Sequence, residues 1–314
     1  MKKVALIALG GNALIREHQT GTIKEQEFNA SSTCKFLVDF IWKGYDIVIV
    51  HGNGPQVGNI LLKNEAGYEK FRLPRFPLDV CVAESQGQIG YILMKQLQNL
   101  LFENNISKQV VNLVSPVIVS KDDPAFKNPT KPVGPFFIKE EAELLTKSNG
   151  WVFKEDARKR GWRRVVASPE PVKIFNSEVV KELLNLGHIV IAAGGGGIPY
   201  VQEKDSKLTG VEAVIDKDLA GAELALEIGA SEFYILTDVP KVYINFRKEN
   251  ELALDKVTVE EAEKYIEEGH FGEGSMGPKV AAAVKFIKKG GSKAVITEAS
   301  ELLKASAGTH FIKN

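Results

Sequence analysis

The sequence is poor in the features that mark several special classes of protein. Its 314 residues include two cysteines, Cys34 and Cys81, which are too few for a disulfide scaffold and favour two buried thiols in a cytosolic protein. No segment approaches the ~20 consecutive apolar residues that span a membrane. The 40 basic residues balance 40 acidic ones, which argues against a nucleic-acid partner bound through bulk charge. A small anionic substrate held by a few cations is compatible with this balance.

The signatures of several enzyme classes are also missing. The chain has no Gly-Lys dipeptide, hence no GxxxxGK[ST] phosphate loop, and it lacks the HRD and DFG triplets of protein kinases. It has no Ser-His-Asp pattern and no cysteine–histidine spacing suited to a metal. His51 and His188 border expected strands, and we expect both to be packed or locally hydrogen-bonded rather than catalytic.

Short apolar runs alternate with longer amphipathic segments. Strands are predicted at residues 4–9, 46–50, 109–119, 164–167, 188–193, 232–236, 294–297 and, as a final edge strand, 309–312. Helices are predicted at residues 28–42, 79–102, 177–186, 218–228 and 278–289, and from a capping box at 258–261 to about residue 268. Strands that are apolar throughout and separated by helices predict an α/β fold, in which helices cover both faces of a mostly parallel sheet.

The first apolar run, at residues 4–9, follows two lysines and superficially resembles a signal peptide. It ends at Gly10-Gly11, and no small-residue cleavage site precedes a polar segment, so we interpret it as a buried strand and expect a cytoplasmic protein. Residues 121–163 break the alternation of strands and helices, because they hold four prolines and many charges. This segment is predicted to protrude as an insertion, either as a solvated surface or as a lid over a ligand site.

Glycines gather at the ends of three predicted strands. These clusters are Gly10-Gly11-Asn12, Gly52-Asn53-Gly54-Pro55 and 194–197, which is four consecutive glycines. In open parallel sheets the ligand crevice lies beyond the carboxyl ends of the strands, and glycine lets backbone N–H groups approach an anion closely. One such cluster could be a tight turn and nothing more. Three at equivalent strand ends favour a phosphate site.

The spacing Gly52-x-Gly54-x-x-x-Gly58 is a loose relative of the dinucleotide-binding fingerprint. The acidic residue expected about 20 residues further on falls near Arg72. This weakens the interpretation as a nicotinamide-dependent oxidoreductase, which stays open as an alternative.

Lysines beside small or glycine-rich loops form the second signal. Lys217 lies between Asp216 and Asp218 at the start of a helix, Lys279 follows a Gly-Ser-Met-Gly-Pro segment, and Lys131 lies in the insertion. Phosphoryl transfer needs positive charge around the moving group more than covalent chemistry, so these lysines are candidates for that task. Either aspartate could orient Lys217, bind magnesium or cap the helix.

Eight motifs, in this order along the chain, resemble carbamate kinases of the amino-acid kinase fold. They occupy residues 8–14, 51–58, 83–91, 166–169, 193–199, 215–219, 236–239 and 274–279. Most relatives that phosphorylate amino-acid carboxylates carry a lysine two residues before the first glycine pair, where this chain has Ala8. That departure is typical of carbamate kinases, in which the lysine at Lys217 is thought to supply the charge.

The resemblance implies a three-layer αβα sandwich that works as a homodimer. Residues 1–212, with the insertion 121–163, would form an N-terminal lobe for the acceptor and dimerisation, and residues 213–314 a C-terminal nucleotide-binding lobe. The reaction implied is reversible transfer between ATP and carbamate, giving ADP and carbamoyl phosphate with Mg²⁺ held mainly by the nucleotide phosphates, as in arginine metabolism. A kinase for another carboxylate and a nucleotide-sensing regulator without turnover remain alternatives.

The same resemblance implies roles for particular residues. Lys217 and Lys279 would contact the transferring group, Asp218 would orient both lysines, and Lys131 would reach in from the insertion. The phosphate and acceptor would be held by Gly10, Gly11, Asn12, Gly52, Asn53, Gly54, Gly195 and Gly196. The nucleotide would be bound by Asp216, Thr237, Asp238, Val239, Tyr243, Met276 and Pro278.

Overall fold

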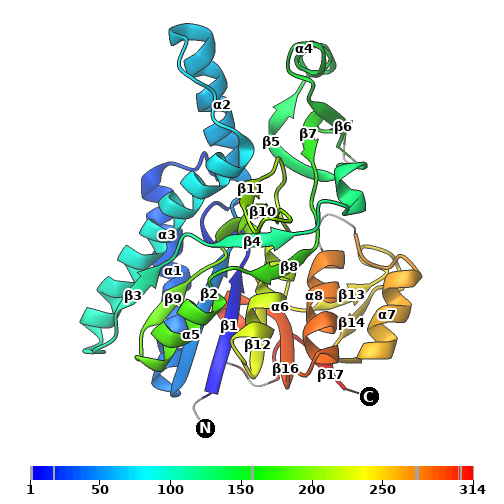
Figure 1. The fold of residues 1–314 in the computed structure, drawn as a ribbon. Helices are drawn as coiled ribbons and strands as arrows, with labels where there is room; N and C mark the ends of the chain where they lie inside the picture. Colours follow the sequence, from blue (N-terminus) through cyan, green and yellow to red (C-terminus); the bar gives the residue numbers. More distant parts are fainter. Residues whose placement is uncertain are drawn as a thin grey trace.

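An eight-stranded sheet runs through the centre of the molecule (Figure 1). We describe it from a computed structural model that covers residues 3–16, 18–156, 159–272, 276–302, 304 and 306–313. The strand order is β15-β17-β16-β12-β1-β2-β9-β3, and every pair is parallel except β16–β17. The strands are β1 (Lys3–Leu9), β2 (Tyr45–His51), β3 (Val110–Asn112), β9 (Ile189–Ile191), β12 (Glu232–Thr237), β15 (Lys256–Thr258), β16 (Lys293–Glu298) and β17 (Thr309–Ile312).

Helices cover both faces of this sheet because successive side chains of each strand point to opposite faces. In β1, Ala5 and Ile7 belong to one apolar core, while Leu6 and Ala8 belong to the other. The first core is closed by α1 (Ile23–Trp42) and α3 (Leu78–Glu103). The second is closed by α5 (Ser177–Asn185), α6 (Lys217–Glu227), α7 (Val259–Glu267) and α8 (Met276–Lys288). The predicted αβα sandwich around a mostly parallel sheet is confirmed.

A second sheet lies beside the first and was not predicted. Its order is β11-β10-β4-β8, from β4 (Pro116–Val119), β8 (Pro171–Ile174), β10 (Ile198–Gln202) and β11 (Leu208–Gly210). The strand predicted at 109–119 is therefore wrong as one element, because β3 lies in the central sheet and β4 in this one. The extended segment is interrupted between β3 and β4 at Ser115, whose backbone N–H donates to the side chain of Gln86 instead of continuing the hydrogen-bond ladder of β3.

The insertion is a small domain with its own sheet, in the order β5-β7-β6. It contains β5 (Lys131–Phe137), α4 (Lys139–Asn149), β6 (Val152–Glu155) and β7 (Trp162–Val166). Its sheet thus runs past the predicted boundary at residue 163, and the strand predicted at 164–167 belongs largely to the insertion rather than to the central sheet. The insertion packs beside α2 (Gly54–Phe71), and both project from the same end of the molecule (Figure 1).

Other boundaries also differ from the predictions. Helix α2 was not predicted, and α1 starts at Ile23, five residues earlier than expected, because Thr22 and Glu25 form a capping box. Strand β17 lies between β15 and β16, so it is not an edge strand. Two hairpin strands complete the fold, β13 (Val242–Ile244) and β14 (Leu252–Leu254).

Two expectations from composition can be compared with the structure. Cys34 and Cys81 are both buried and free, as predicted. Among the described residues, no helix has both the length and the apolar content needed to cross a membrane. The division into an N-terminal lobe that ends at residue 212 and a C-terminal lobe that begins at residue 213 stays a prediction. Strand β1 of the first lobe and strand β12 of the second pair directly in the central sheet.

Candidate active site

A cavity of about 960 Å³ opens at the carboxyl ends of β1, β2, β12 and β16. This is where a parallel sheet is expected to bind its ligand. Most residues predicted for the site line it: Gly10, Gly11, Gly52, Asn53, Gly54, Lys131, Gly195, Asp216, Lys217, Asp218, Thr237, Asp238, Val239, Tyr243, Met276 and Lys279. Two predicted residues, Gly196 and Pro278, are not among its lining residues, and the side chain of Asn12 lies outside the part of the chain that the structure describes.

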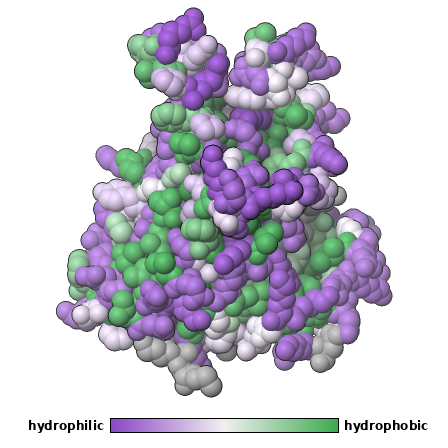
Figure 2. All heavy atoms as spheres, viewed as in Figure 1, coloured by the Kyte–Doolittle hydropathy of each residue, from purple (hydrophilic) through white to green (hydrophobic). Residues whose placement is uncertain are grey.

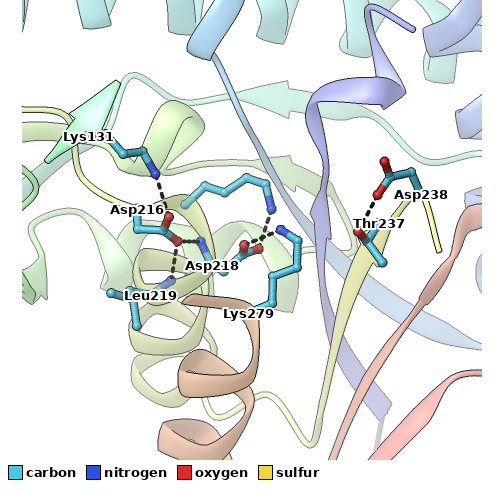
Figure 3. A network of polar contacts seen from close by, with 8 residues as sticks. Lys131, Asp216, Asp218, Leu219, Thr237, Asp238 and Lys279 are labelled. Atoms are coloured by element: carbon cyan, nitrogen blue, oxygen red, sulfur yellow. Dashed lines mark hydrogen bonds and ion pairs between the residues drawn. The ribbon is translucent and has the colours of Figure 1, made fainter. Parts of the chain in front are cut away.

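The start of α6 organises the charges of the cavity (Figure 3). Asp216 caps this helix, because its Oδ1 accepts from the backbone N–H of Asp218 at 2.9 Å and of Leu219 at 3.4 Å. The cap fixes the first turn, in which Lys217 and Asp218 are the first two residues. The helix-capping role that we considered for Asp216 is therefore present, together with a second contact described below.

Asp218 holds two lysines from different elements (Figure 3). One carboxylate oxygen accepts from Lys217 Nζ, and the other accepts from Lys279 Nζ, on α8, at 2.8 Å. The side chain of Asp218 is 2% exposed and those of the lysines are 11% and 15% exposed. Two ammonium groups are thus fixed side by side against one carboxylate in a nearly water-free position, where charge interactions are strong.

A third lysine comes from the insertion. Lys131 is the first residue of β5, and its Nζ donates to Asp216 Oδ2 at 2.7 Å. Its side chain is 31% exposed, more than those of the two lysines on Asp218. The insertion therefore contributes a cation to the rim of the cavity.

Burial and mutual charge set the protonation of this cluster. Burial lowers the pKa of Lys217, the charge of Asp218 opposes this, and the neighbouring Lys279 adds to it, so that the pKa is about 8. Burial would also lower the pKa of Lys279, but the charge of Asp218 outweighs it and the pKa is raised. For Asp218, burial opposes ionisation, yet the two ammonium groups keep its pKa well below the usual range. At neutral pH the cluster carries two positive charges and one negative charge.

Glycines let the loops of the cavity pack closely together. Gly195 has φ of +68°, and a Cβ at this position would overlap the side chain of Asn53. Asn53 is itself fixed, since its Nδ2 donates to Ser85 Oγ at 2.9 Å. Gly196 also leaves no space for a side chain, because a Cβ there would overlap the backbone carbonyl of Ile215. Gly195 therefore lines the cavity, and Gly196 packs against the backbone of Ile215, which also lines it.

His51 lies below the glycine loops and is buried, as expected. Its Nδ1 donates to the carbonyl of Gly52 at 3.0 Å, so the neutral ring is fixed in one tautomer. Burial lowers the pKa of His51 to about 4, and Lys217 acts in the same direction. The prediction that His51 is locally hydrogen-bonded is confirmed.

Two groups of lining residues were not predicted. On the side of α8 and β13, the cavity is also lined by Phe246, Arg247, His270, Phe271 and Gly272. On the side of α1, it is lined by Arg16, Ser32, Thr33, Lys35, Phe36, Ala299 and Ser300. These residues carry no motif, and the one signal in the sequence that could have pointed to part of them is the aromatic Phe246, three residues after the predicted Tyr243.

The chain resembles known proteins over its whole length. Residues 3–298 match the amino acid kinase family. The carbamate kinase of Pyrococcus horikoshii is 50% identical over 312 residues, which is 98% of this chain and 99% of the relative, and that of Thermococcus kodakarensis is 50% identical over the full length of both. The solved structure of the carbamate kinase from Giardia lamblia bound to AMP-PNP superposes with a TM-score of 0.91, at 40% identity and 99% coverage of both chains.

The fold and the lysine–aspartate site define a phosphotransferase, and the chain belongs to the amino acid kinase family. Within that family it belongs with the carbamate kinases, since relatives at 50% identity over 98% or more of the chain carry that name.

Proposed function

We propose that the protein catalyses reversible phosphoryl transfer between ATP and carbamate, giving ADP and carbamoyl phosphate. The observation that carries this proposal is the pair of buried lysines on Asp218 at the carboxyl end of the sheet. A carbamate oxygen is already anionic, so it attacks the γ-phosphorus without losing a proton. The protein therefore has to align the two anions and neutralise the charge that gathers between them.

The geometry supports a division of labour within the cluster. Lys217 and Lys279 face the same space from two helices, and each keeps N–H groups beyond the one given to Asp218. These ammonium groups would contact the oxygens of the transferring phosphoryl group. Asp218 would be a positioning residue that holds both lysines, and Lys131 would add charge on the side of the insertion.

The glycine loops would receive the acceptor and the phosphates. Helix α2 begins at Gly54, so the N–H groups of its first turn and its positive dipole end are directed at the cavity, where anions are favoured. The backbone of Gly10, Gly11 and Gly52 approaches the cavity without side chains. We assign carbamate and the transferred group to this region.

The nucleoside would lie on the side of α8 and β13. Tyr243 and Phe246 form an aromatic pair there, with ring centroids 5.7 Å apart, and Met276 also lines the cavity. An apolar and aromatic wall suits a purine base. Thr237 Oγ1 donates to Asp238 Oδ1 at 3.1 Å, which leaves the second oxygen of Asp238 available for a ribose hydroxyl. A carbamate kinase from Giardia lamblia was solved with AMP-PNP bound, which supports a nucleotide in this fold.

Magnesium would enter with the nucleotide as MgATP. Asp216 and Asp218 are already engaged by ammonium groups, and the described residues contain no group of three or more Asp, Glu, His or Cys side chains placed to hold a metal. This donor set fits an ion held chiefly by phosphate oxygens and water, which is the usual state of Mg²⁺ in kinases.

We also propose a cytoplasmic homodimer that acts in arginine metabolism. An exposed apolar surface lies along β8, α5 and the segment just before β4, where Val114, Val172, Phe175 and Val179 are each 46–56% exposed. Hydrogen bonds between these segments make the surface continuous, and Figure 2 shows apolar side chains gathered on this part of the face. Light scattering should give twice the chain mass, and Phe175→Glu should reduce it to one chain if this surface forms the dimer.

The decisive experiment supplies carbamoyl phosphate and ADP and couples ATP formation to hexokinase and glucose. The proposal predicts glucose 6-phosphate formation that depends on carbamoyl phosphate. Three controls separate the alternatives: acetylglutamate or aspartate with ATP tests another carboxylate kinase, ADP binding without turnover indicates a regulator, and fluorescence quenching by NADH indicates an oxidoreductase. A negative coupled assay with well-folded protein would overturn the proposal.

A further inference from the structure

We propose that the protein binds a phosphate-type oxyanion in a second, smaller cavity on the α1 face of the central sheet, apart from the catalytic cavity. This cavity has a volume of about 130 Å³. Since a water molecule occupies about 30 Å³ in the liquid, there is room for roughly four waters or for one tetrahedral oxyanion.

The register of three neighbouring strands builds the floor of this cavity. Strands β12, β16 and β17 lie side by side (Figure 1). Tyr234 of β12 pairs with Val295 of β16, and Val295 pairs with His310 of β17, so the three side chains share one face of the sheet. Lys293 and Thr297 lie two residues before and after Val295, and they therefore share that face. All five residues line the cavity.

The charge of the cavity wall is of one sign. Its ionisable lining residues in the described part of the chain are three lysines, one histidine and two tyrosines, and no carboxylate is among them. The basic side chains are Lys43, Lys293, Lys304 and His310; Lys304 is paired with Glu301 at 2.8 Å, and burial lowers the pKa of His310. Glu232 lies nearby without lining the cavity, and it is engaged by the hydroxyl groups of Tyr45 and Tyr234. An anion placed in the cavity would therefore meet basic groups on several sides.

The hydrogen-bonding capacity of Lys293 is only partly used. Lys293 donates to Tyr234 OH at 3.0 Å and lies 3.7 Å from Glu232, which leaves at least one N–H for a ligand. Thr297 is 1% exposed, and its hydroxyl has no hydrogen-bond partner among the described residues.

The basic residues indicate which anion the cavity prefers. Its basic side chains are lysines and a histidine, with no arginine, so the wall offers the point charges of lysine instead of the planar fork that matches a carboxylate. Point charges from several directions suit a tetrahedral group. Free inorganic phosphate and the phosphate of a monoester share this chemistry.

The two cavities are separate in space, although neighbouring residues of the chain line them. Thr297 lines the small cavity, and the next residue, Glu298, lines the catalytic one. Each cavity also has its own histidine in its lining, His310 in the small cavity and His270 in the large one. Binding at the two places can therefore be read separately.

The test follows the ring signals of both histidines by NMR, assigned with His270→Gln and His310→Gln. Sulfate is titrated against sodium chloride of equal ionic strength, because sulfate does not change its charge between pH 6 and 9. We expect a saturable shift of His310 and a rise in its pKa, which burial and the nearby Lys293 otherwise lower. The His310 shift should persist when AMP-PNP saturates the catalytic cavity and holds the His270 signal constant.

Variants show whether the lining residues make the site. Lys293→Gln should weaken sulfate binding at least tenfold. Lys304 is 65% exposed, so Lys304→Gln should fold normally and weaken binding about threefold. Lys288→Gln is the matched control, because Lys288 also pairs with one glutamate but lies on α8 over the other face.

Inorganic phosphate and glycerol 3-phosphate then distinguish the two sources. Tighter binding of the monoester identifies a phosphorylated metabolite, and binding of inorganic phosphate alone identifies the free ion; both support the site. The proposal is overturned if His310 responds equally to chloride, or if none of the lining variants changes the sulfate affinity.

Discussion

The two aspartates on either side of Lys217 hold their lysines in different ways. Asp218 is 2% exposed and receives both Lys217 and Lys279, which come from helices packed on the central sheet. Asp216 is more accessible, with 12% of its side chain exposed, and it receives Lys131 from the insertion. One carboxylate thus anchors charge that belongs to the core, and the other receives charge that a separate domain delivers.

This difference means that the positions of Lys217 and Lys279 are fixed by the core, whereas the position of Lys131 depends on where the insertion lies. A buried charge cluster keeps its geometry because every partner is held by packing. Lys131 depends on how β5 rests against α2, where Gly58 and Gly134 lie in direct backbone contact and Asn149 reaches Glu65 at 3.5 Å. Substitutions at the core pair should therefore affect the chemical step, and substitutions at Lys131 chiefly the binding of substrate.

The largest effect is expected from the core lysines. Lys217→Ala and Lys279→Ala should each lower kcat about 10²-fold or more, because each removes a fixed cation aimed at charge that develops in the transition state. Turnover in the coupled assay is the measurement. Lys288→Ala, on the same helix as Lys279 but at the surface, should leave kcat unchanged. Near-normal turnover in either core variant would contradict the assigned role.

Exchanging each aspartate for asparagine tests the comparison directly. Asp218→Asn leaves two buried ammonium groups without a counter-charge, which should destabilise the fold by about 3 kcal/mol and lower kcat about 10²-fold. Asp216→Asn keeps a residue that caps helices well, so stability should change by less than about 1 kcal/mol. Urea unfolding and the coupled assay give both quantities. Equal losses in the two variants would show that the core and the insertion are not distinct in this respect.

Lys131→Gln should have a smaller effect, which falls mainly on KM. The side chain is partly exposed and its charge is screened by water, so we expect about a tenfold rise in KM for carbamoyl phosphate with kcat changed less than about threefold. Lys127→Gln serves as the control, because Lys127 also lies in the insertion but does not line the cavity. A fall in kcat comparable to that of Lys217→Ala would place Lys131 with the core lysines.

The sequence predicted the core of this site better than its surroundings. Apolar runs identify strands such as β1 and β2 because these are buried on both faces, and the glycine clusters and Lys217 follow directly from such strands or motifs. Helix α2 was missed because its first residues, Gly54 and Pro55, read as a loop, although proline suits the first turn of a helix. The second sheet was missed because its strands are three to five residues long and several contain proline.

Tertiary packing accounts for the residues that no local pattern could identify. Arg16 and Lys35 line the cavity from the segment before α1 and from α1 itself, which reach it only because η1 (Gly11–Ala13) and the capped start of α1 turn the chain over the end of β1. The contact between Lys131 and Asp216 joins residues 85 positions apart. Such approaches depend on the whole topology and not on spacing in the chain.

The smallest expected effect is a pH dependence of kcat/KM, which arises from Lys217 of the core pair and not from Lys131. The pKa of Lys217 is lowered to about 8, and the residue acts in its protonated form, so kcat/KM should fall as the pH rises through this value. From pH 7 to 8.5 the protonated fraction decreases about fourfold, and the rate of ATP formation from carbamoyl phosphate and ADP should decrease equally. Bound phosphates favour the ammonium form, so the decline in kcat should begin at higher pH than that in kcat/KM. Lys217→Arg keeps its charge throughout this range, hence its rate, although lower, should be flat to pH 8.5. If the rate of Lys217→Arg declines with pH as in the unmodified protein, another group is responsible for the pH dependence. If the decline is lost, the pH dependence is due to the titration of Lys217 and not of Lys131.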